Sequence, residues 1–162
     1  MTAQNDAPVS SANTGLTVNE GAGGAITQTL LTFTDAEQTA SQLIFTITSG
    51  PSNGTLAKGG SSLGVGGTFT QADIDANLIT YTHNGGETPS DAFGFGVSDG
   101  AGGSVTGQIF TLTITPQNDA PAIASNGGGA AASVSVAENI AAVTTVVAVS
   151  YTHLTLPTNR EV

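Results

Sequence analysis

The chain has 162 residues, of which 2 are Lys or Arg and 12 are Asp or Glu, so its formal net charge is −10. So acidic a chain does not hold nucleic acid or an anionic membrane by charge, and its charges repel one another unless cations bind. It has no Cys, which excludes disulfides and thiolate sites. No apolar run approaches the roughly 18 residues of a membrane span. No signal peptide is visible, so an export signal is expected outside this segment.

Residues 2–8 and 115–121 carry nearly the same heptapeptide, Thr-Ala-Gln-Asn-Asp-Ala-Pro and Thr-Pro-Gln-Asn-Asp-Ala-Pro. The two copies are offset by 115 − 2 = 113 residues. That offset is too long for a solenoid unit and suits one β-sandwich domain. We therefore interpret the heptapeptide as the joint between successive domains of a tandem array.

Each joint combines a proline with oxygen-bearing side chains. Pro8 and Pro121 cannot donate to a sheet, and each holds the residue before it extended. The Asn-Asp pairs at 5–6 and 118–119 supply hard oxygens, which Ca²⁺ takes in sets of about 6–8. Ordinary turn chemistry is the alternative, since Asn and Asp also favour turns. Two copies at domain spacing in a very acidic chain favour Ca²⁺.

Between the joints, short alternating segments predict strands separated by turns. The predicted strands cover residues 15–20, 26–33, 43–47, 55–57, 78–83, 91–98 and 104–115. Gly21 to Gly24 predicts a turn, and the break in alternation at Leu30-Leu31 predicts a bulge or a change of sheet. Residues 70–77 give the helical signal, because Thr70 suits a cap and Asp73 the positive helix start.

These elements predict an all-β fold, an antiparallel Greek-key sandwich of the immunoglobulin-like kind with one short helix near residues 71–76. The apolar residues suffice for one core of about 110 residues and not for two. The side chains expected inside are Leu43, Phe45, Ile47, Phe69, Tyr81, Phe93, Phe95, Val97 and Leu112.

The domain boundaries follow from the joints. Residues 1–11 end a preceding joint, 12–116 form the sandwich, 117–132 form the second joint and a Gly/Ala linker, and 133–148 begin a second domain. Val134 to Asn139 and Val143 to Ala148 are its predicted strands. Val149 to Thr158 resembles the translation of a sequencing adapter, so residues 149–162 are expected to be non-biological. Residues 123–162 are expected to have no core of their own.

The first domain resembles a cadherin-like repeat of the chondroitin-sulfate-proteoglycan type, as found in large bacterial surface adhesins. The resemblance spans residues 5–121 and rests on these stretches taken together: Leu16 to Gly21, Phe33 to Glu37, Phe69 to Ile74, Tyr81 to Gly85, Asp91 to Phe93, Val97 to Gly100 and Asn118 to Pro121.

The resemblance implies Ca²⁺ at the domain joints. Asp35 and Glu37 stand at the acid-x-acid ligand pair, Asp99 at the Ala-x-Asp ligand, Glu20 at the first-strand glutamate and Asp119 at the linker aspartate. Glu37 departs from the family's pattern, because an Asp is usual there, and the longer side chain is expected to weaken Ca²⁺ binding at that site.

Two acidic clusters are therefore expected. Asp6, Asp35, Glu37 and Asp99 should converge at the N-terminal end of the domain, since strands end at Asp35 and Asp99 and the first joint passes beside them. Glu20 and Asp119 should meet at the other end, with Asp91 as a further candidate.

The sequence signals for other kinds of site are weaker than the signal for Ca²⁺. His83 has no Cys or second His for a zinc site, which favours a turn or surface role. Glu87 and Asp91 could form a glycosidase pair, but no sugar platform is visible. Asn53-Gly54-Thr55 fits a glycosylation sequon.

Three functions remain open for the chain. The sequence favours a Ca²⁺-binding, non-enzymatic spacer in an extracellular or cell-surface adhesin, and the partners expected for it are neighbouring repeats and cell-surface or matrix ligands. The alternatives are a module for ligand binding or homophilic adhesion, and an accessory domain of a secreted enzyme. More copies of the joint in the parent gene would favour the first, and an appended catalytic domain the last.

Overall fold

The computed structural model describes residues 4–119, 122–123 and 148–149 of the chain. The chain divides into two compact units, residues 1–116 and 117–162. In the second unit, β12 (Ala122–Ile123) pairs antiparallel with β13 (Ala148–Val149). The strand expected at 134–139, most of the one expected at 143–148 and nearly all of the adapter-like tail lie outside the described residues. The expectation that residues 123–162 lack a core remains a prediction for the same reason.

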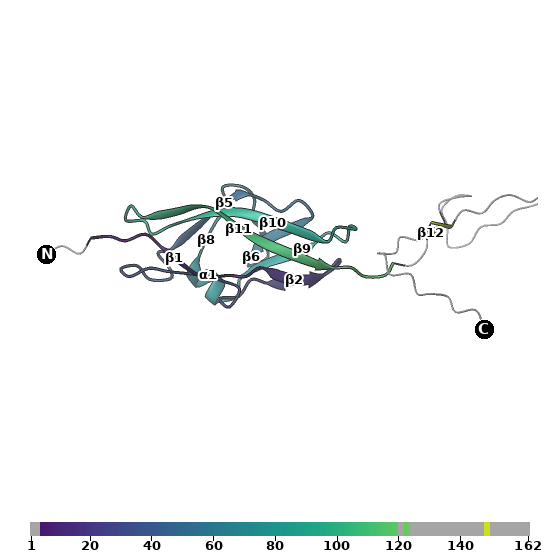
Figure 1. Ribbon diagram of the computed structural model, residues 1–162, viewed down its shortest axis with the longest axis horizontal. Helices are drawn as coiled ribbons and strands as arrows, with labels where there is room; N and C mark the ends of the chain where they lie inside the picture. The colour runs from purple at the N-terminus through teal and green to yellow at the C-terminus, as the bar shows by residue number, and fades with distance from the viewer. Residues whose placement is uncertain (1–3, 120–121, 124–147, 150–162) are drawn as a thin grey trace, which may run out of the picture. The chain divides into compact units, whose positions relative to one another are not determined.

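The first unit is a β-sandwich (Figure 1). One sheet has the strand order β2 (Leu16–Asn19), β11 (Ser104–Thr115), β10 (Ser90–Ser98), β5 (Ile44–Ser49) and β8 (Thr68–Thr70). The other has the order β3 (Gly23–Ala25), β9 (Ile79–His83), β6 (Gly54–Lys58) and β7 (Ser61–Ser62). A separate pair joins β1 (Val9–Asn13) to β4 (Leu31–Thr34). The predicted all-β sandwich is confirmed.

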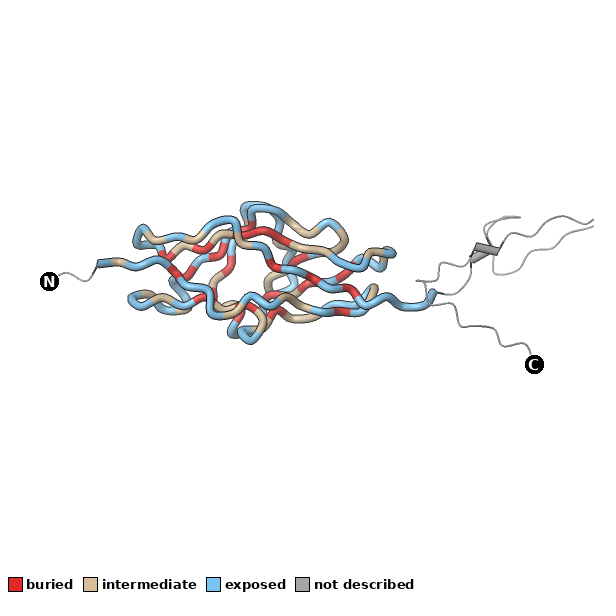
Figure 2. The backbone as a smooth tube through the Cα atoms, in the orientation of Figure 1, coloured by how far each residue is buried: buried red, intermediate tan, exposed pale blue. Residues whose placement is uncertain are grey.

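The core lies between the sheets, and the burial pattern alternates along the strands that line it (Figure 2). On β11, for example, Phe110, Leu112 and Ile114 are buried while the threonines between them are exposed. All nine side chains expected inside are buried, together with residues from β4, β6, β9 and α1. Phe95 lies with its ring centroid 5.9 Å from Phe33 and 5.6 Å from Phe45, within the range of favourable aromatic pairing.

The predicted short helix is α1 (Gln71–Asp75). Thr70 caps it, because its side chain accepts from the Asp73 N–H and the Asp73 carboxylate accepts from the Thr70 N–H. Burial raises the pKa of Asp73, but hydrogen bonds from Lys58 and Thr70 outweigh it and hold the pKa below its ordinary value. Lys58 also forms an ion pair with Asp73 at 2.6 Å, which ties α1 to β6.

The structure corrects the strand prediction near the N-terminus. Gly23 and Gly24 belong to β3 rather than to a turn, and a turn at residues 28–30 interrupts the strand expected at 26–33. In that turn the N–H groups of Leu30 and Leu31 both donate to the carbonyl of Thr27. The chain then passes from the β3 sheet to the β1–β4 pair, which is the change of sheet that Leu30-Leu31 predicted.

Two further features went unpredicted. β1 begins at Val9, inside the segment assigned to the preceding joint, and four of its five residues are exposed, so it has no apolar alternation to detect. β2 pairs with β11 in parallel, whereas the other described strand pairs are antiparallel. The chain enters the first unit beside β1 and leaves it from the far end of β11, at the opposite end (Figure 1).

Candidate metal-binding ends of the domain

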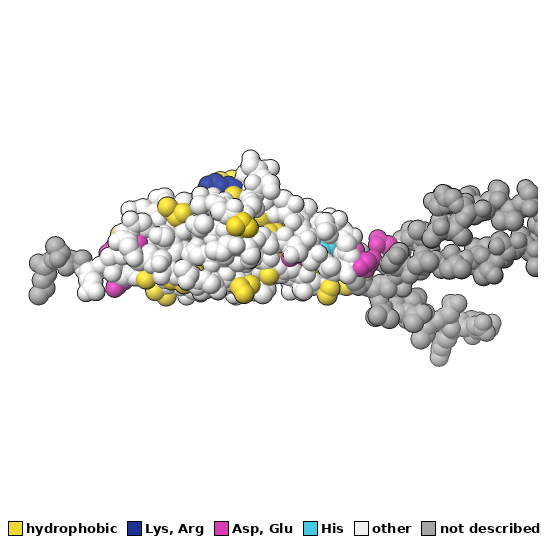
Figure 3. Space-filling model, turned by 90° about the horizontal axis from the view of Figure 1, so that it is seen from above, with side chains coloured by type: hydrophobic (Ala, Val, Ile, Leu, Met, Phe, Trp, Pro, Cys, Tyr) yellow, Lys and Arg dark blue, Asp and Glu magenta, His cyan; other side chains and the backbone are white. Residues whose placement is uncertain are grey.

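Acidic side chains gather mainly toward the two ends of the domain on the face shown in Figure 3, and the surface between them is largely uncharged. The loop that follows β4 supplies two of the acids at the N-terminal end. Asp35 accepts the N–H groups of Glu37 (2.9 Å) and Gln38 (3.1 Å) on Oδ1, which folds the loop back on itself. Glu37 Oε2 accepts the N–H of Asp6 at 3.3 Å. The first joint and the acid-x-acid loop are therefore in direct contact.

Asp99, which follows β10, lies at the same end and is only 3% exposed. Its Oδ1 accepts the N–H groups of Ala101, Gly102 and Gly103 at 2.7–3.0 Å, and its Oδ2 accepts the Asn5 amide at 2.7 Å. A side chain at Gly103 would overlap Asp99 and the backbone of Asp6, so this close approach requires glycine. The Asn5 amide, followed by these backbone N–H groups, holds the pKa of Asp99 below its ordinary value despite burial.

Asn5 connects the two halves of this end. Its Nδ2 donates to Asp99, and its Oδ1 accepts from Gln38 Nε2 at 3.2 Å. Asp6, Asp35, Glu37 and Asp99 thus lie around one network of amides, although no three of their carboxylates come within 4.8 Å of one another. Sequence reasoning missed Gln38, and the only signal for it was its place one residue after the acid-x-acid pair.

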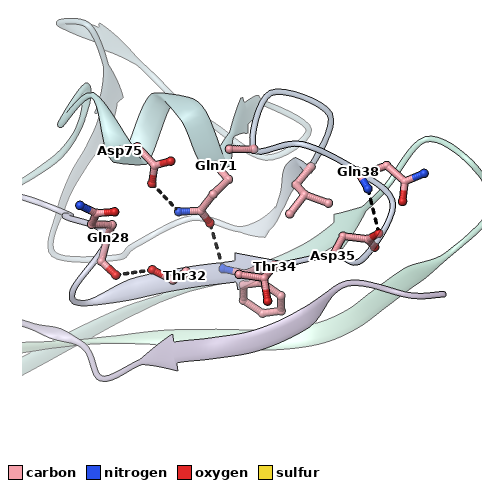
Figure 4. Close-up of a pocket in the computed structure, with 10 residues that line it drawn as sticks. Gln28, Thr32, Thr34, Asp35, Gln38, Gln71 and Asp75 are labelled. Carbon is pink, nitrogen blue, oxygen red and sulfur yellow. Dashed lines mark hydrogen bonds between the residues drawn. The ribbon is translucent and has the colours of Figure 1, made fainter.

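Two oxygens in this network are buried without a hydrogen-bond donor, Asp35 Oδ2 and Gln38 Oε1. Both residues line a pocket of about 270 Å³. Gln71 and Asp75 line its other side, and the Gln71 amide bridges the Phe33 N–H to the Asp75 carboxylate (Figure 4). An unsatisfied buried acceptor costs about 1–3 kcal/mol, so these oxygens favour a cation or a donor beside them. The residues present therefore fit a hard metal ion.

The C-terminal end holds Glu20, directly after β2, and Glu87, in the loop before β10. Their carboxylate oxygens lie within 4.8 Å of each other. Asp119 belongs to the second unit. Glu87 was considered only as a catalytic partner for Asp91, so its place beside Glu20 was not predicted. A turn rich in glycine separates it from β9 and hides the proximity from any sequence pattern.

His83 fixes the two loops that carry these glutamates. It is 3% exposed, which corrects the expected surface role while keeping the turn role. Its Nδ1 accepts the N–H groups of Gly21 and Gly85, each at 3.2 Å, and its Nε2 bonds Thr88 Oγ1 at 3.0 Å. Because backbone N–H groups only donate, Nδ1 carries no proton and Nε2–H is the donor.

Asp91, the further candidate ligand, accepts four hydrogen bonds in the folded domain. Its Oδ1 accepts the N–H groups of Ser52 and Ala92, and its Oδ2 accepts the Asn53 N–H and the Tyr81 hydroxyl. Two donors on each oxygen use the usual capacity of a carboxylate. Burial raises the pKa of Asp91, but these bonds outweigh it and leave the pKa below its ordinary value. Burial and the bond to Asp91 raise the pKa of Tyr81.

Residues 8–114 match the cadherin-like family. This chain belongs to the cadherin-like family. Human FRAS1-related extracellular matrix protein 1 is 35% identical over 105 residues, which cover 64% of this chain and 5% of that protein. Extracellular matrix protein 3 of Lytechinus variegatus is 37% identical over 123 residues, which cover 68% of this chain and 4% of that protein. Human chondroitin sulfate proteoglycan 4 is 36% identical over 110 residues, which cover 68% of this chain and 5% of that protein.

The cadherin-like domain is thus a small part of the length of these relatives. Their names describe extracellular matrix proteins and a proteoglycan rather than enzymes, which favours a non-catalytic domain. Within the described residues, no helix has the length and apolar character needed to cross a membrane.

Proposed function

We propose that this cadherin-like domain is a Ca²⁺-binding repeat that acts as a stiffened spacer in an extracellular or cell-surface adhesion protein. The observation that carries the proposal is the pair of buried, donor-free oxygens, Asp35 Oδ2 and Gln38 Oε1, at the end where the first joint enters. The matrix proteins among its relatives support the extracellular setting. The setting in a bacterial adhesin remains a prediction.

At the N-terminal end, Asp6, Asp35, Glu37 and Asp99 would hold the ion, with the amide oxygens of Asn5 and Gln38 beside them. Ca²⁺ takes 6–8 oxygens in flexible geometry, which suits a set of carboxylates and amides on loops. The bound ion would supply the positive charge that compensates these acids. The residues themselves position the loop after β4 against the first joint, through the Glu37 contact to Asp6 and the Asn5 contact to Asp99.

At the C-terminal end, we assign Glu20 and Asp119 as ligands, as the sequence predicted, and add Glu87. Asp91 stays the further candidate there; its oxygens, like those of Asp99 at the other end, already accept hydrogen bonds that a bound ion would have to share or replace. The following repeat would complete this site, so neighbouring repeats of the same chain are the expected partners. Because the two ends of the domain lie far apart (Figure 1), ions at successive joints would fix the repeats end to end.

Calorimetric titration with Ca²⁺ at about 0.15 M salt tests the N-terminal site. The wild-type chain should bind with a Kd of about 10⁻⁴–10⁻³ M, the range of extracellular modules. Glu37→Gln should weaken binding by about tenfold, because it removes a ligand charge while its amide oxygen still accepts the Asp6 N–H. Glu87→Gln is the matched control for this site, since it makes the same change in an exposed side chain at the opposite end of the domain.

Glu87→Gln should leave the Kd of the N-terminal site within about twofold of wild type, because screening at this salt confines electrostatic effects to roughly 8 Å. Equal losses in the two variants would mean that Ca²⁺ responds only to net charge. Absence of binding by the wild type would contradict the proposed site.

A further inference from the structure

Two Asn-Gly pairs lie in the described domain, Asn53-Gly54 and Asn84-Gly85, and their surroundings differ. Asn84 is exposed in the loop between β9 and β10, and Gly85 is exposed with φ at 81°. The Gly85 N–H donates to His83 Nδ1 at 3.2 Å. The Gly86 N–H donates to Asn84 Oδ1 at 2.9 Å. A backbone nitrogen, a base and a polarised amide carbonyl therefore meet within three consecutive residues.

We propose that Asn84 is a self-modification site, at which the folded domain converts the asparagine amide into an acid. The Gly85 nitrogen attacks Asn84 Cγ while its proton passes to His83 Nδ1, which carries no proton in the Nε2–H tautomer and already accepts the Gly85 N–H, together with that of Gly21. Negative charge builds up on Asn84 Oδ1, where the Gly86 N–H stabilises it. A base within hydrogen-bond reach of the proton that it removes satisfies the geometric requirement for general base catalysis.

The atoms balance without a further reactant except water. The new N–Cγ bond forms, the Cγ–NH₂ bond breaks, and the proton held on His83 leaves with the amine as ammonia. The resulting five-membered succinimide is opened by water at either carbonyl, which gives aspartate or isoaspartate at position 84. His83 is returned to its starting form, so the chain supplies the base and the polarising donor itself.

Asn53-Gly54 provides the internal comparison. The Asn53 N–H donates to Asp91, and its carbonyl accepts from the Asn84 N–H. Gly54 lies in β6, where a side chain would overlap the Tyr81 ring and the Thr82 carbonyl. This backbone has no room to swing toward its own side chain without breaking β6 from β9. The fold therefore promotes the reaction at Asn84 and suppresses it at Asn53.

The product places a new carboxylate in the loop that also carries Glu87, whose carboxylate lies within 4.8 Å of Glu20. Negative charge at the C-terminal end of the domain thus increases with the age of the protein. This inference depends on His83 and its neighbours and does not require that the ends bind Ca²⁺.

Peptide mass spectrometry of the whole chain, incubated at neutral pH without Ca²⁺, tests the proposal. The amide-to-acid mass change is followed at each asparagine, with isoaspartate detected separately. In the folded chain Asn84 should react at least about a hundredfold faster than Asn53, the low end of general base catalysis. In urea-unfolded chain the two sites should react at similar rates. Equal rates in the folded chain, or slower reaction at Asn84 than at Asn53, would overturn the proposal.

A second variant separates the base from simple loop mobility. His83→Gln removes the imidazole, and we expect the rate at Asn84 in the folded variant to fall by about a hundredfold or more. If this variant keeps its fold and the rate at Asn84 is unchanged, His83 is not the base and the proposal fails. If the variant does not fold, the wild-type comparison of Asn84 with Asn53 still decides the matter.

Discussion

Phe95→Ala is expected to destabilise the domain by about 3–5 kcal/mol, the range for removing a fully buried phenylalanine. Phe95 has no exposed surface and pairs with the rings of Phe33, Phe45 and Phe93. Its loss leaves a cavity at the centre of the core, and the neighbouring rings belong to three strands that cannot close on it independently. Urea unfolding followed by circular dichroism measures the change in the free energy of unfolding.

Ile109→Ala is the matched control for Phe95→Ala, because Ile109 lies on β11, next to β10, and is 61% exposed. It should cost no more than about 0.5 kcal/mol, as expected for a surface substitution. Similar losses in the two variants would mean that the inner and outer faces of this sheet have been assigned wrongly.

Asp91→Ala is expected to destabilise the domain by about 2–4 kcal/mol, although it removes no core side chain. The substitution leaves the Tyr81 hydroxyl and the N–H groups of Ser52 and Asn53 without their acceptor. Tyr81 has no exposed surface, so its hydroxyl has little access to water as a replacement. Thermal and urea unfolding of the variant measure the loss.

Tyr81→Phe tests the structural role of Asp91 by removing the donor of their hydrogen bond instead of the acceptor. We expect this variant to lose about 1 kcal/mol of the free energy of unfolding. The double variant should lose less than the sum of the two single losses, since the residues share one hydrogen bond. Strict additivity, or a loss below about 0.5 kcal/mol in Asp91→Ala, would contradict a structural role for Asp91.

The stability contribution of Asp91 also has a defined pH dependence. Its pKa is lower in the folded domain than the ordinary value of 3.8, so its contribution is present above that pH and is lost as the pH falls below it. Asp73 and Asp99 act in the same direction. The raised pKa of Tyr81 has the opposite sign, and its contribution is lost as the pH rises above its ordinary value of 10.0. The melting temperature of the wild-type domain should fall as the pH is lowered below 3.8, and this fall should be smaller in Asp91→Asn.

Much of the fold was readable from the sequence because the strands of one core alternate strictly. Phe93, Phe95 and Val97 on β10, and Phe45 and Ile47 on β5, fall on one face by that rule, and all five are buried. β1 was not predicted, because an exposed strand that pairs only with β4 has no buried face and therefore no alternation of apolar residues. The parallel pairing of β2 with β11 joins residues from the two ends of the domain, and no local pattern encodes it.

The candidate sites were less accessible to sequence reasoning, for a physical reason. Acidic residues that directly follow a predicted strand can be picked out of the sequence, so Asp35, Glu37 and Asp99 could be named in advance. Neutral amides give no comparable sequence signal for such a link, and only the contacts in the structure show that Asn5 and Gln38 connect those acids. Asp91 looks like the other acids in sequence, yet its carboxylate serves a buried tyrosine. Proximity of Glu20 and Glu87 arises from long-range folding alone.

The most direct test of the stiffened spacer is small-angle X-ray scattering of two copies of the first domain, joined in tandem through the heptapeptide at residues 115–121. That joint brings the C-terminal end of one copy to the N-terminal end of the next. With Ca²⁺ in excess, the account predicts a longer maximum dimension and a narrow distribution of shapes, and chelator should shorten and broaden it. Identical scattering with Ca²⁺ and with chelator would contradict a joint that Ca²⁺ stiffens.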